Sequence, residues 1–140
     1  LFSANKNRPL ESVADIASGG EISRLMLTIK SLAADATALP TIIFDEIDTG
    51  VSGEIADKMG EIMAGMARYM QVIAITHLPQ VASRGKTHYR IYKDEDGETT
   101  QTRIELLDDN RRVQEVARML SGSQLTDAAM KNARELLNRK

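Results

Sequence analysis

The chain has 140 residues, of which 42% are hydrophobic and 27% charged, and this composition is ordinary for a soluble globular protein. Its 18 basic and 20 acidic residues give a formal net charge of −2, so the overall charge predicts no nucleic-acid partner, although a local basic patch is compatible with it. The absence of cysteine excludes disulfides and thiolate metal sites and fits a reducing compartment. The length fits one domain, and we expect no membrane partner because no apolar stretch approaches the length of a membrane span. The chain begins in mid-pattern with Leu1, which suggests a piece of a longer protein.

The first segment leads into a glycine-containing helix start. Residues 1–17 are expected to be extended and then to turn, and the tetrapeptide Ser18-Gly19-Gly20-Glu21 follows. Two glycines let the backbone approach a ligand closely, the N–H groups of a helix start attract anions, and Ser18 adds a hydroxyl donor. The same residues could simply cap the helix, contributing about 0.5–2 kcal/mol, and taken alone this is the more frequent role.

A helix is predicted from Glu21 to the residues before Pro40, because apolar residues recur there at helical spacing. We expect these residues to form one buried stripe: Ile22, Leu25, Met26, Ile29, Leu32 and Ala33.

An apolar run over residues 41–44 is followed at once by acidic residues. Such a run predicts a buried parallel strand, which places Asp45 and Glu46 at the carboxyl edge of the sheet, where α/β proteins bind ligands. Two adjacent acids can have different roles, because one can hold a metal through water while the other accepts a proton. The alternative is a solvated strand end, with Asp48 and Gly50 as turn residues.

A second helix is predicted over residues 52–68, and a second buried strand over residues 71–76. His77 stands directly at the end of that strand, although a lone histidine is more often structural than catalytic. Strand, helix and strand at this spacing predict a right-handed crossover and a parallel sheet. The inner face of the helix is expected to carry Ile55, Met59, Ile62, Met63 and Met66.

The last third of the chain predicts a hairpin and two helices. Strands over residues 87–93 and 99–106 flank an Asp-Gly turn. Helices near residues 111–120 and 126–138 follow, separated by a Ser-Gly-Ser break. We expect Val113, Val116, Ala117 and Leu120 to point inward from the first of these helices. The fold class is therefore α/β, with parallel strands, flanking helices, a β-hairpin and two closing helices.

The order of these motifs resembles the C-terminal lobe of an ABC-type P-loop ATPase head. The tetrapeptide at residues 18–21 is similar to the ABC signature motif, residues 42–46 to the Walker B strand, residues 47–48 to the D-loop, and His77 to the switch histidine. Longer stretches resemble the bacterial SMC-like DNA-repair ATPases, and the resemblance covers essentially all of residues 1–140. These stretches are residues 17–24, 44–53, 76–82, 116–122 and 133–137.

The resemblance implies roles for the residues at the two strand ends. Asp45 would orient Mg²⁺ through water, and Glu46 would polarise the water that attacks ATP. His77 would contact the γ-phosphate or hold that water in line. General-base assistance of this kind is typically 10²–10⁴-fold.

It also implies a homodimer of heads. Ser18, Gly19 and Gly20, together with Glu21 of the same motif, would reach across the dimer interface to ATP bound by the other head. Asp48 would report across the same interface.

One motif of the family does not occur in these 140 residues, namely Gly-x-x-x-x-Gly-Lys-Ser/Thr. The resemblance places this Walker A loop in an N-terminal half beyond a coiled coil. We therefore expect the chain alone to be inactive, and to need the N-terminal half as a partner. The implied activity couples ATP hydrolysis to the repair of DNA double-strand breaks and to recombination, in the cytoplasm at the nucleoid; DNA is a partner by resemblance only.

Three alternatives stay open. The chain could be a non-catalytic assembly module, and Ser18→Arg would distinguish this from an ATPase head. It could be the nucleotide-binding domain of another ABC ATPase such as a transporter, although transporters usually have Gly-Gln where Gly20-Glu21 stands. A metal-dependent phosphotransfer domain using Asp45, Glu46 and Asp48 would need a further acid on a neighbouring strand end, and Thr76-His77 offers none.

Overall fold

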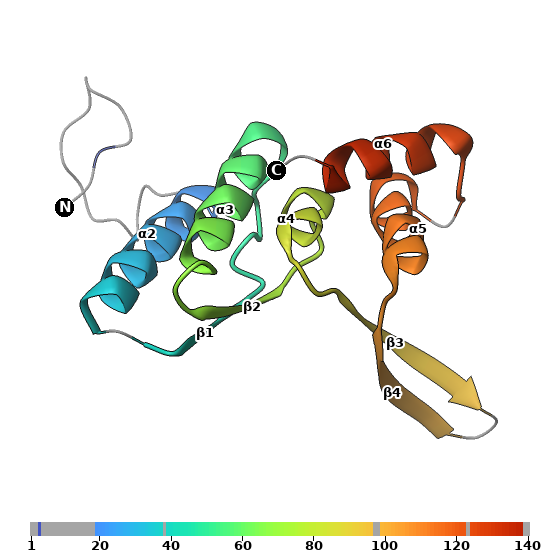
Figure 1. The fold of residues 1–140 in the computed structure, drawn as a ribbon, viewed down its shortest axis with the longest axis horizontal. Helices are drawn as coiled ribbons and strands as arrows, with labels where there is room; N and C mark the ends of the chain where they lie inside the picture. The colour runs from blue at the N-terminus through green and yellow to red at the C-terminus, as the bar shows by residue number, and fades with distance from the viewer. Residues whose placement is uncertain (1–2, 4–18, 38, 97–98, 123, 139–140) are drawn as a thin grey trace. The chain divides into compact units, whose positions relative to one another are not determined.

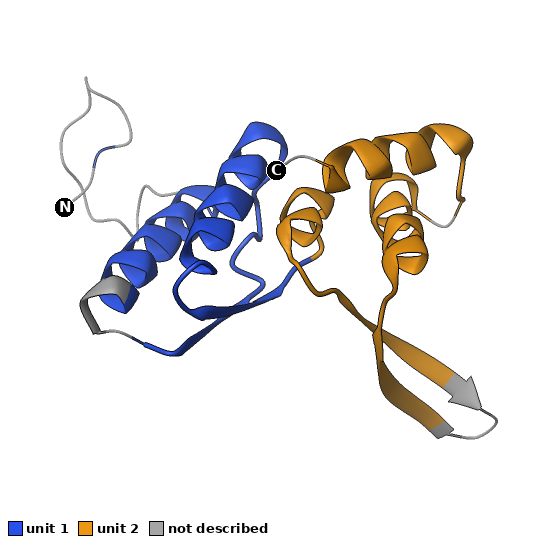
Figure 2. Cartoon of the chain, in the orientation of Figure 1, with its two compact units in different colours: residues 1–76 blue, residues 77–140 orange. Residues whose placement is uncertain are grey.

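The structure, a computed structural model, describes residue 3 and residues 19–37, 39–96, 99–122 and 124–138. The predictions for residues 1–18, with the exception of Ser3, fall on residues that the structure does not describe. Length alone allowed for one domain; the chain groups into two compact units, residues 1–76 and residues 77–140 (Figure 2). Each unit is described by itself.

Unit 1 contains the two predicted strands and the two predicted helices. Its elements are α2 (Gly19–Thr37), β1 (Thr41–Asp45), α3 (Gly53–Met66) and β2 (Gln71–Ile75) (Figure 1). β1 and β2 pair in parallel, with Asp45 opposite Ile75, so the predicted parallel pairing is confirmed. The β-branched residues of β1 favour the strand, whereas the interior of α2 after Gly20 contains neither glycine nor proline.

The core of unit 1 lies on one face of this two-stranded sheet. Phe44 of β1 is fully buried, and the ammonium of Lys30 on α2 lies 5.8 Å from the centre of its ring. The predicted inner residues Met59, Met63 and Met66 of α3 are buried, which confirms that part of the α3 prediction. The other buried apolar residues of α2 and α3 are Leu27, Ala34 and Ala56.

The prediction of two buried strands is wrong for the opposite face of the sheet. Ile43 is 56% exposed, Ile73 42% and Ile75 43%. The register pairs Ile43 with Ile73, so these side chains share one face. Parallel sheets are normally covered on both faces, but the described residues of unit 1 cover only one.

The predicted stripe of α2 is also wrong as a buried surface. Leu32 is 66% exposed, and Ile22, Met26 and Ile29 are exposed as well, while Leu27 and Ala34 are the buried residues of this helix. Ile55 and Ile62 of α3 are likewise exposed rather than buried. Helical spacing identifies an apolar face but does not say whether the chain itself supplies the surface that covers it.

Unit 2 contains one helix that was not predicted and four predicted elements. Its elements are α4 (Pro79–Arg84), β3 (Tyr89–Asp96), β4 (Thr99–Leu106), α5 (Asp109–Ser121) and α6 (Asp127–Leu137). β3 and β4 pair antiparallel, which confirms the hairpin, although its turn at residues 97–98 lies outside the described residues. α5 is followed by its C-cap residue Gly122, whose φ of 77° favours glycine.

The closing helices pack through small side chains. Val116 and Ala117 of α5, as predicted, form a buried cluster with Ala129 and Ala133 of α6. Val113 is partly buried against this cluster, whereas Leu120 is exposed, contrary to its predicted inward position. In the parts of the chain that are described, no helix is long and apolar enough to cross a bilayer.

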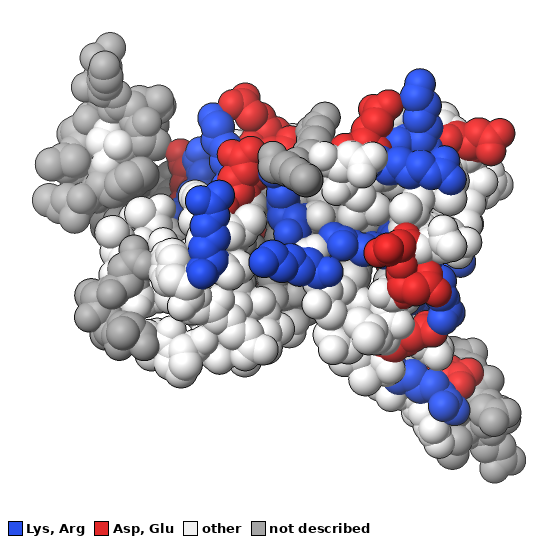
Figure 3. Space-filling view, in the orientation of Figure 1, with Lys and Arg blue, Asp and Glu red and all other residues white. Residues whose placement is uncertain are grey.

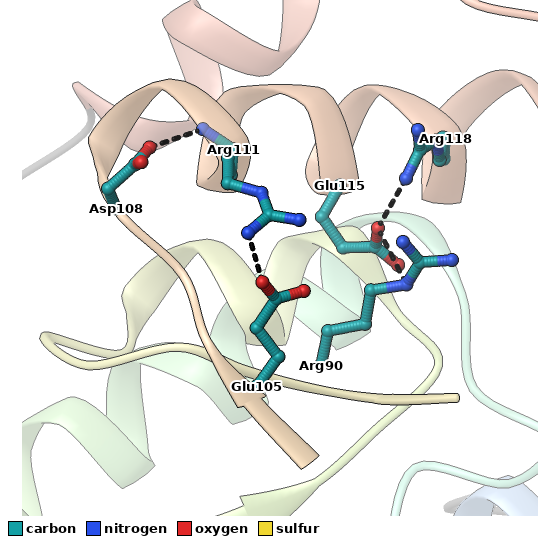
Figure 4. Close-up of polar contacts among 6 residues, drawn as sticks. All are labelled: Arg90, Glu105, Asp108, Arg111, Glu115 and Arg118. Atoms are coloured by element: carbon teal, nitrogen blue, oxygen red, sulfur yellow. Dashed lines mark hydrogen bonds and ion pairs between the residues drawn. The ribbon is translucent and has the colours of Figure 1, made fainter. Parts of the chain in front are cut away.

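Ionic contacts attach the hairpin to α5 (Figure 4). Arg90 of β3 lies 3.4 Å from Glu115 of α5, and Arg111 of α5 pairs with Glu105 of β4. Asp108 caps α5 by accepting a hydrogen bond from the backbone N–H of Arg111 at 2.8 Å. The other face of the hairpin carries four large apolar side chains that are each more than half exposed: Tyr89, Ile91, Ile104 and Leu106.

Candidate functional site

The carboxylates at the end of β1 are open to solvent. Asp45 and Glu46 are both exposed, and the Glu46 backbone N–H donates to the carbonyl of Ile75 at 3.0 Å, which extends the parallel ladder by one bond. Glu46 has a φ of +44°, in the left-handed region that residues other than glycine rarely adopt. Such conformations cluster at functional sites and persist where the surroundings enforce them.

Hydrogen bonds in the following turn enforce that conformation. The backbone N–H and the hydroxyl of Thr49 both donate to the carbonyl of Glu46, at 3.2 and 2.9 Å. The N–H of Val51 donates to the carbonyl of Asp48 at 3.1 Å. The Glu46 carboxylate is thus presented from a turn whose backbone is bonded on both sides.

The start of α2 lies against this turn. The Ser23 hydroxyl donates to the carbonyl of Thr49 at 3.2 Å. A Cβ on Gly20 would lie 2.7 Å from the carbonyl oxygen of Gly50, so only glycine permits this approach. Gly50 has a φ of +76° and also requires glycine. Of the predicted signature residues, Gly19 and Gly20 therefore lie beside the loop that follows Glu46.

Two residues of the predicted signature motif remain, Ser18 and Glu21. Glu21 lies half-buried in the first turn of α2, and Ser18 lies outside the described residues. An acidic residue in a first turn interacts favourably with the helix dipole, so Glu21 has a structural reason to be there. The predicted contacts of Ser18 and Glu21 with a nucleotide stay predictions.

Asp48 has a structural partner that sequence reasoning missed. Its side chain is only 1% exposed, and its carboxylate accepts a hydrogen bond from the Thr76 hydroxyl, just beyond β2. This bond ties the loop after β1 to the end of β2. Asp48 is buried whereas Asp45 and Glu46 are exposed. The three carboxylates therefore do not form the group that a metal-dependent phosphotransfer domain would use. A role of Asp48 at a head interface stays a prediction.

His77 is exposed and opens unit 2 directly after Thr76. Only Leu78 separates it from α4, which begins at Pro79, and proline is favoured in a first helical turn. Pro79 is therefore the feature of the sequence from which α4, the helix that was not predicted, could have been predicted. The predicted action of His77 together with Asp45 and Glu46 stays a prediction.

The chemistry of the strand end suits a hydrated cation and a phosphate. Mg²⁺ commonly keeps several waters and binds through one or two carboxylates plus substrate phosphates. Asp45 and Glu46 offer exposed carboxylates, and the start of α2 offers N–H groups to an anion. Across the described ranges, no three His, Asp or Glu side chains gather in a metal-binding group, so further ligands to a cation would come from substrate, water or other polypeptide.

A polar cluster in unit 2 also escaped sequence reasoning. The Nη2 of Arg112 on α5 donates to the carbonyls of Ser83, at 2.9 Å, and Gly85, at the end of α4. The Arg112 Nε and the Nδ1 of His88 are buried without hydrogen-bond partners. Burial lowers the pKa of His88, the charge of Arg112 lowers it further, and Glu115 acts in the opposite direction. No local sequence pattern signals this cluster, because its members come from three segments.

Charge alone does not identify a nucleic-acid surface. The face of unit 2 in Figure 3 carries basic and acidic side chains intermixed. Several of the basic residues are ion-paired: Arg90 and Arg118 with Glu115, Arg103 with Asp94, and Arg111 with Glu105. These arginines are therefore already engaged within unit 2.

The known sequences that are similar to this chain are those of DNA-repair proteins. No family model matches it. It is 46% identical over 138 residues to the DNA repair protein RecN of Bacillus subtilis, covering 98% of this chain and 24% of that protein. The RecN proteins of Rickettsia felis and Vibrio cholerae are 44% and 41% identical, over 97% and 98% of this chain and 25% of each relative. The chain thus spans about a quarter of the length of the curated relatives it matches.

A solved structure has the same fold. It comes from work on ATP-driven dimerization and DNA-stimulated activation of SMC ATPases. Its TM-score is 0.63 at 14% sequence identity, over 84% of this chain and 70% of that chain. The likeness confirms the predicted fold class, which is α/β with parallel strands, flanking helices, a β-hairpin and two closing helices.

Proposed function

We propose, since this chain is related over nearly its whole length to the RecN proteins, that it is the C-terminal part of an SMC-like ATPase head. In the complete protein, this head would couple ATP binding and hydrolysis to DNA double-strand-break repair and recombination. The observation that carries the proposal is the exposed Glu46, held in a left-handed conformation beside Asp45 at the carboxyl end of a parallel strand.

The carboxylates have separate roles. Asp45 would hold the cation through water, and Glu46 would polarise the attacking water and accept its proton. His77 holds the water or contacts the terminal phosphate. ATP and Mg²⁺, when bound, would supply the phosphoanhydride bond and the charge that neutralises the phosphate oxygens. The protein's contribution is mainly the position of these three side chains, since phosphoryl transfer needs little covalent help.

A second head completes the site. The start of α2, with Ser18, Gly19, Gly20 and Glu21, serves the nucleotide bound by the partner head of a homodimer, and Asp48 lies in the loop that senses this interface. The close approach of Gly20 to Gly50 supports this assignment, because it couples the helix start to the loop that carries Glu46. Binding of the nucleotide by one loop would then bear on the other.

The N-terminal half of the same protein is the second partner. It would supply the Walker A loop that these 140 residues lack and would cover the exposed faces of each unit. Unit 1 presents Ile43, Ile73 and Ile75, and unit 2 presents the apolar face of its hairpin. The length of the relatives supports this, since about three quarters of each lies outside the matched region. DNA is the third partner, and the location is the cytoplasm, at the nucleoid.

The test replaces Glu46 by glutamine in the full-length protein. Glu46→Gln nearly keeps the size of the side chain but removes the carboxylate that acts as the base, so we expect ATP turnover to fall by about 10²–10⁴-fold. Glu54→Gln is the matched control, because Glu54 is an exposed residue on α3 that pairs with Lys58 at 2.7 Å. Turnover by Glu46→Gln at the rate of the control would refute the assignment of Glu46 as the base.

An assembly module without catalysis is the second candidate, and the exposed apolar faces favour it. Under that function, Ser18→Arg would leave assembly intact. For an ATPase head, a bulky cation at the signature loop should abolish ATP-driven pairing. Analytical ultracentrifugation of the full-length variant, with and without ATP, separates the two.

A further inference from the structure

Arg112 holds the end of the helix that follows His77. We infer that Arg112 is a positioning residue for His77 and acts through α4. This inference rests on the proposed ATPase function, but it concerns a different unit from the one that carries Glu46.

α4 has little stability of its own. It is only six residues long, and short helices depend on tertiary contacts because nucleation is unfavourable. Its N-cap residue, Leu78, makes no side-chain hydrogen bond, and its C-cap residue, Gly85, is extended. The helix must therefore be held by the residues packed against it.

The guanidinium of Arg112 supplies that hold at the C-terminal end. Its Nη2 donates to the carbonyls of Ser83, at 2.9 Å, and of Gly85, which would otherwise be among the unsatisfied acceptors of the last turn. A cation at this end also interacts favourably with the helix dipole. The first turn of α5 fixes Arg112 in turn, since its own N–H donates to the carbonyl of Asp108 at 2.8 Å.

His77 lies between two anchored points of the chain. One residue before it, the Thr76 hydroxyl donates to the Asp48 carboxylate. Two residues after it, Pro79 begins α4 and is buried. If α4 loses the Arg112 contact, the chain on that side of His77 is held less firmly, and a displacement of about 1 Å at a reacting group can cost about 10²-fold in rate.

The adjoining arginine provides a matched control. Arg111 has the same charge and lies on the same turn of α5, but its side chain pairs with Glu105 of the hairpin (Figure 4). Arg111→Ala removes an arginine from unit 2 without touching the carbonyls of α4. A difference between the two variants therefore reports on the α4 contact and not on net charge.

The experiment measures ATP turnover of the full-length protein with Arg112→Ala, Arg112→Lys and Arg111→Ala. Arg112→Ala should lower kcat by about ten- to a hundredfold and leave the KM for ATP within about twofold, since it disturbs the catalytic position and not nucleotide binding. Arg112→Lys should recover part of the loss, because an ammonium can still donate to one of the carbonyls. Hydrogen exchange of the α4 amides should rise in Arg112→Ala and not in Arg111→Ala.

Equal kcat for Arg112→Ala and Arg111→Ala would overturn the inference, and so would a change confined to KM. If Arg112→Ala does not fold, Arg112→Lys against Arg111→Lys decides in the same way. Failure here is distinct from failure of the ATPase proposal. If Glu46→Gln abolishes turnover while the arginine variants behave alike, only the role of Arg112 is lost.

Discussion

Glu46 combines an exposed carboxylate with a backbone conformation that L-amino acids rarely adopt. Three hydrogen bonds keep it there: its N–H to Ile75, and two donations from Thr49 to its carbonyl. Conformations of this kind cost free energy, and a protein retains them where function depends on where the side chain is held. We therefore expect the conformation of Glu46 to lower the free energy of unfolding while it supports ATP hydrolysis.

Glycine at this position should make that trade visible. Glu46→Gly removes the Cβ clash of the left-handed conformation, which is worth roughly 1–2 kcal/mol, against the extra chain entropy of glycine. We expect a gain of about 1 kcal/mol in the free energy of unfolding with loss of ATP turnover. Denaturant unfolding of this variant beside Glu46→Gln, which keeps the strain, measures the effect. Equal stability of the two variants would show that no strain is stored at residue 46.

Substitution of Gly20 tests the contact between the start of α2 and the loop after Glu46. A Cβ there would lie 2.7 Å from the Gly50 carbonyl oxygen, so Gly20→Ala should force the two loops apart and cost about 1–3 kcal/mol. Gly19→Ala is the control, because nothing lies within 4 Å of its added Cβ. The midpoints of denaturant unfolding compare them. A Gly20→Ala variant as stable as Gly19→Ala would mean that the close approach is absent in solution.

The site residues differ in how far sequence predicts them. Asp45 and Glu46 follow an apolar run, and a local pattern is enough to place them at a strand end. The burial of Asp48 could not be predicted, because its partner Thr76 is 28 residues away and belongs to another element. The same holds for Arg112, whose acceptors lie 29 and 27 residues away on the chain.

At the scale of elements, the existence of the described helices and strands other than α4 followed from local periodicity. The parallel pair, the hairpin and the two closing helices were predicted within a few residues of their ends. Which face of an element is buried was predicted less well, as Leu32 of α2 and Ile43 of β1 show. Periodicity reports that a face is apolar, whereas burial depends on whether another segment is present to cover it.

His88, which lies partly buried just before β3, should make the free energy of unfolding depend on pH. Burial lowers the pKa of His88 below its usual 6.5 in the folded state, so folding favours the neutral imidazole. The stability that this gives is fully present above the pKa of the unfolded state, about 6.5, and is lost as the pH falls through the lowered folded pKa.

His88→Gln should therefore flatten the pH dependence of the free energy of unfolding below about pH 6.5. The effect is moderate, since His88 is only about half buried. Denaturant unfolding at about pH 7.5 and about pH 5 compares the variant with the parent protein. A variant that loses as much stability on acidification as the parent would show that His88 is not the group responsible.

At the scale of the whole molecule, the chain contains the residues proposed for water activation, whereas the motif expected to bind the nucleotide phosphates does not occur in it. The Walker A pattern is absent from the 140 residues, and each unit exposes an apolar surface. Both observations fit a segment that spans a quarter of its relatives. The head would then become complete only when the rest of the polypeptide packs on it.

ATP affinity should follow this division. Isothermal titration of the 140-residue chain should give weak binding or none, with no hydrolysis, whereas the full-length protein should bind and turn over ATP. The physical reason is that backbone amides and the lysine of a Walker A loop make most contacts with the phosphates. Micromolar affinity of the chain alone would contradict the division.

The most direct measurement follows head pairing in the full-length Glu46→Gln protein after ATP is added, for example by light scattering. If Glu46 activates the water, the variant binds ATP and pairs but cannot hydrolyse it, so we expect paired heads to persist long after those of the parent protein have separated. Separation of the Glu46→Gln heads at the parental rate would contradict the central claim that this carboxylate, at the end of β1, drives hydrolysis.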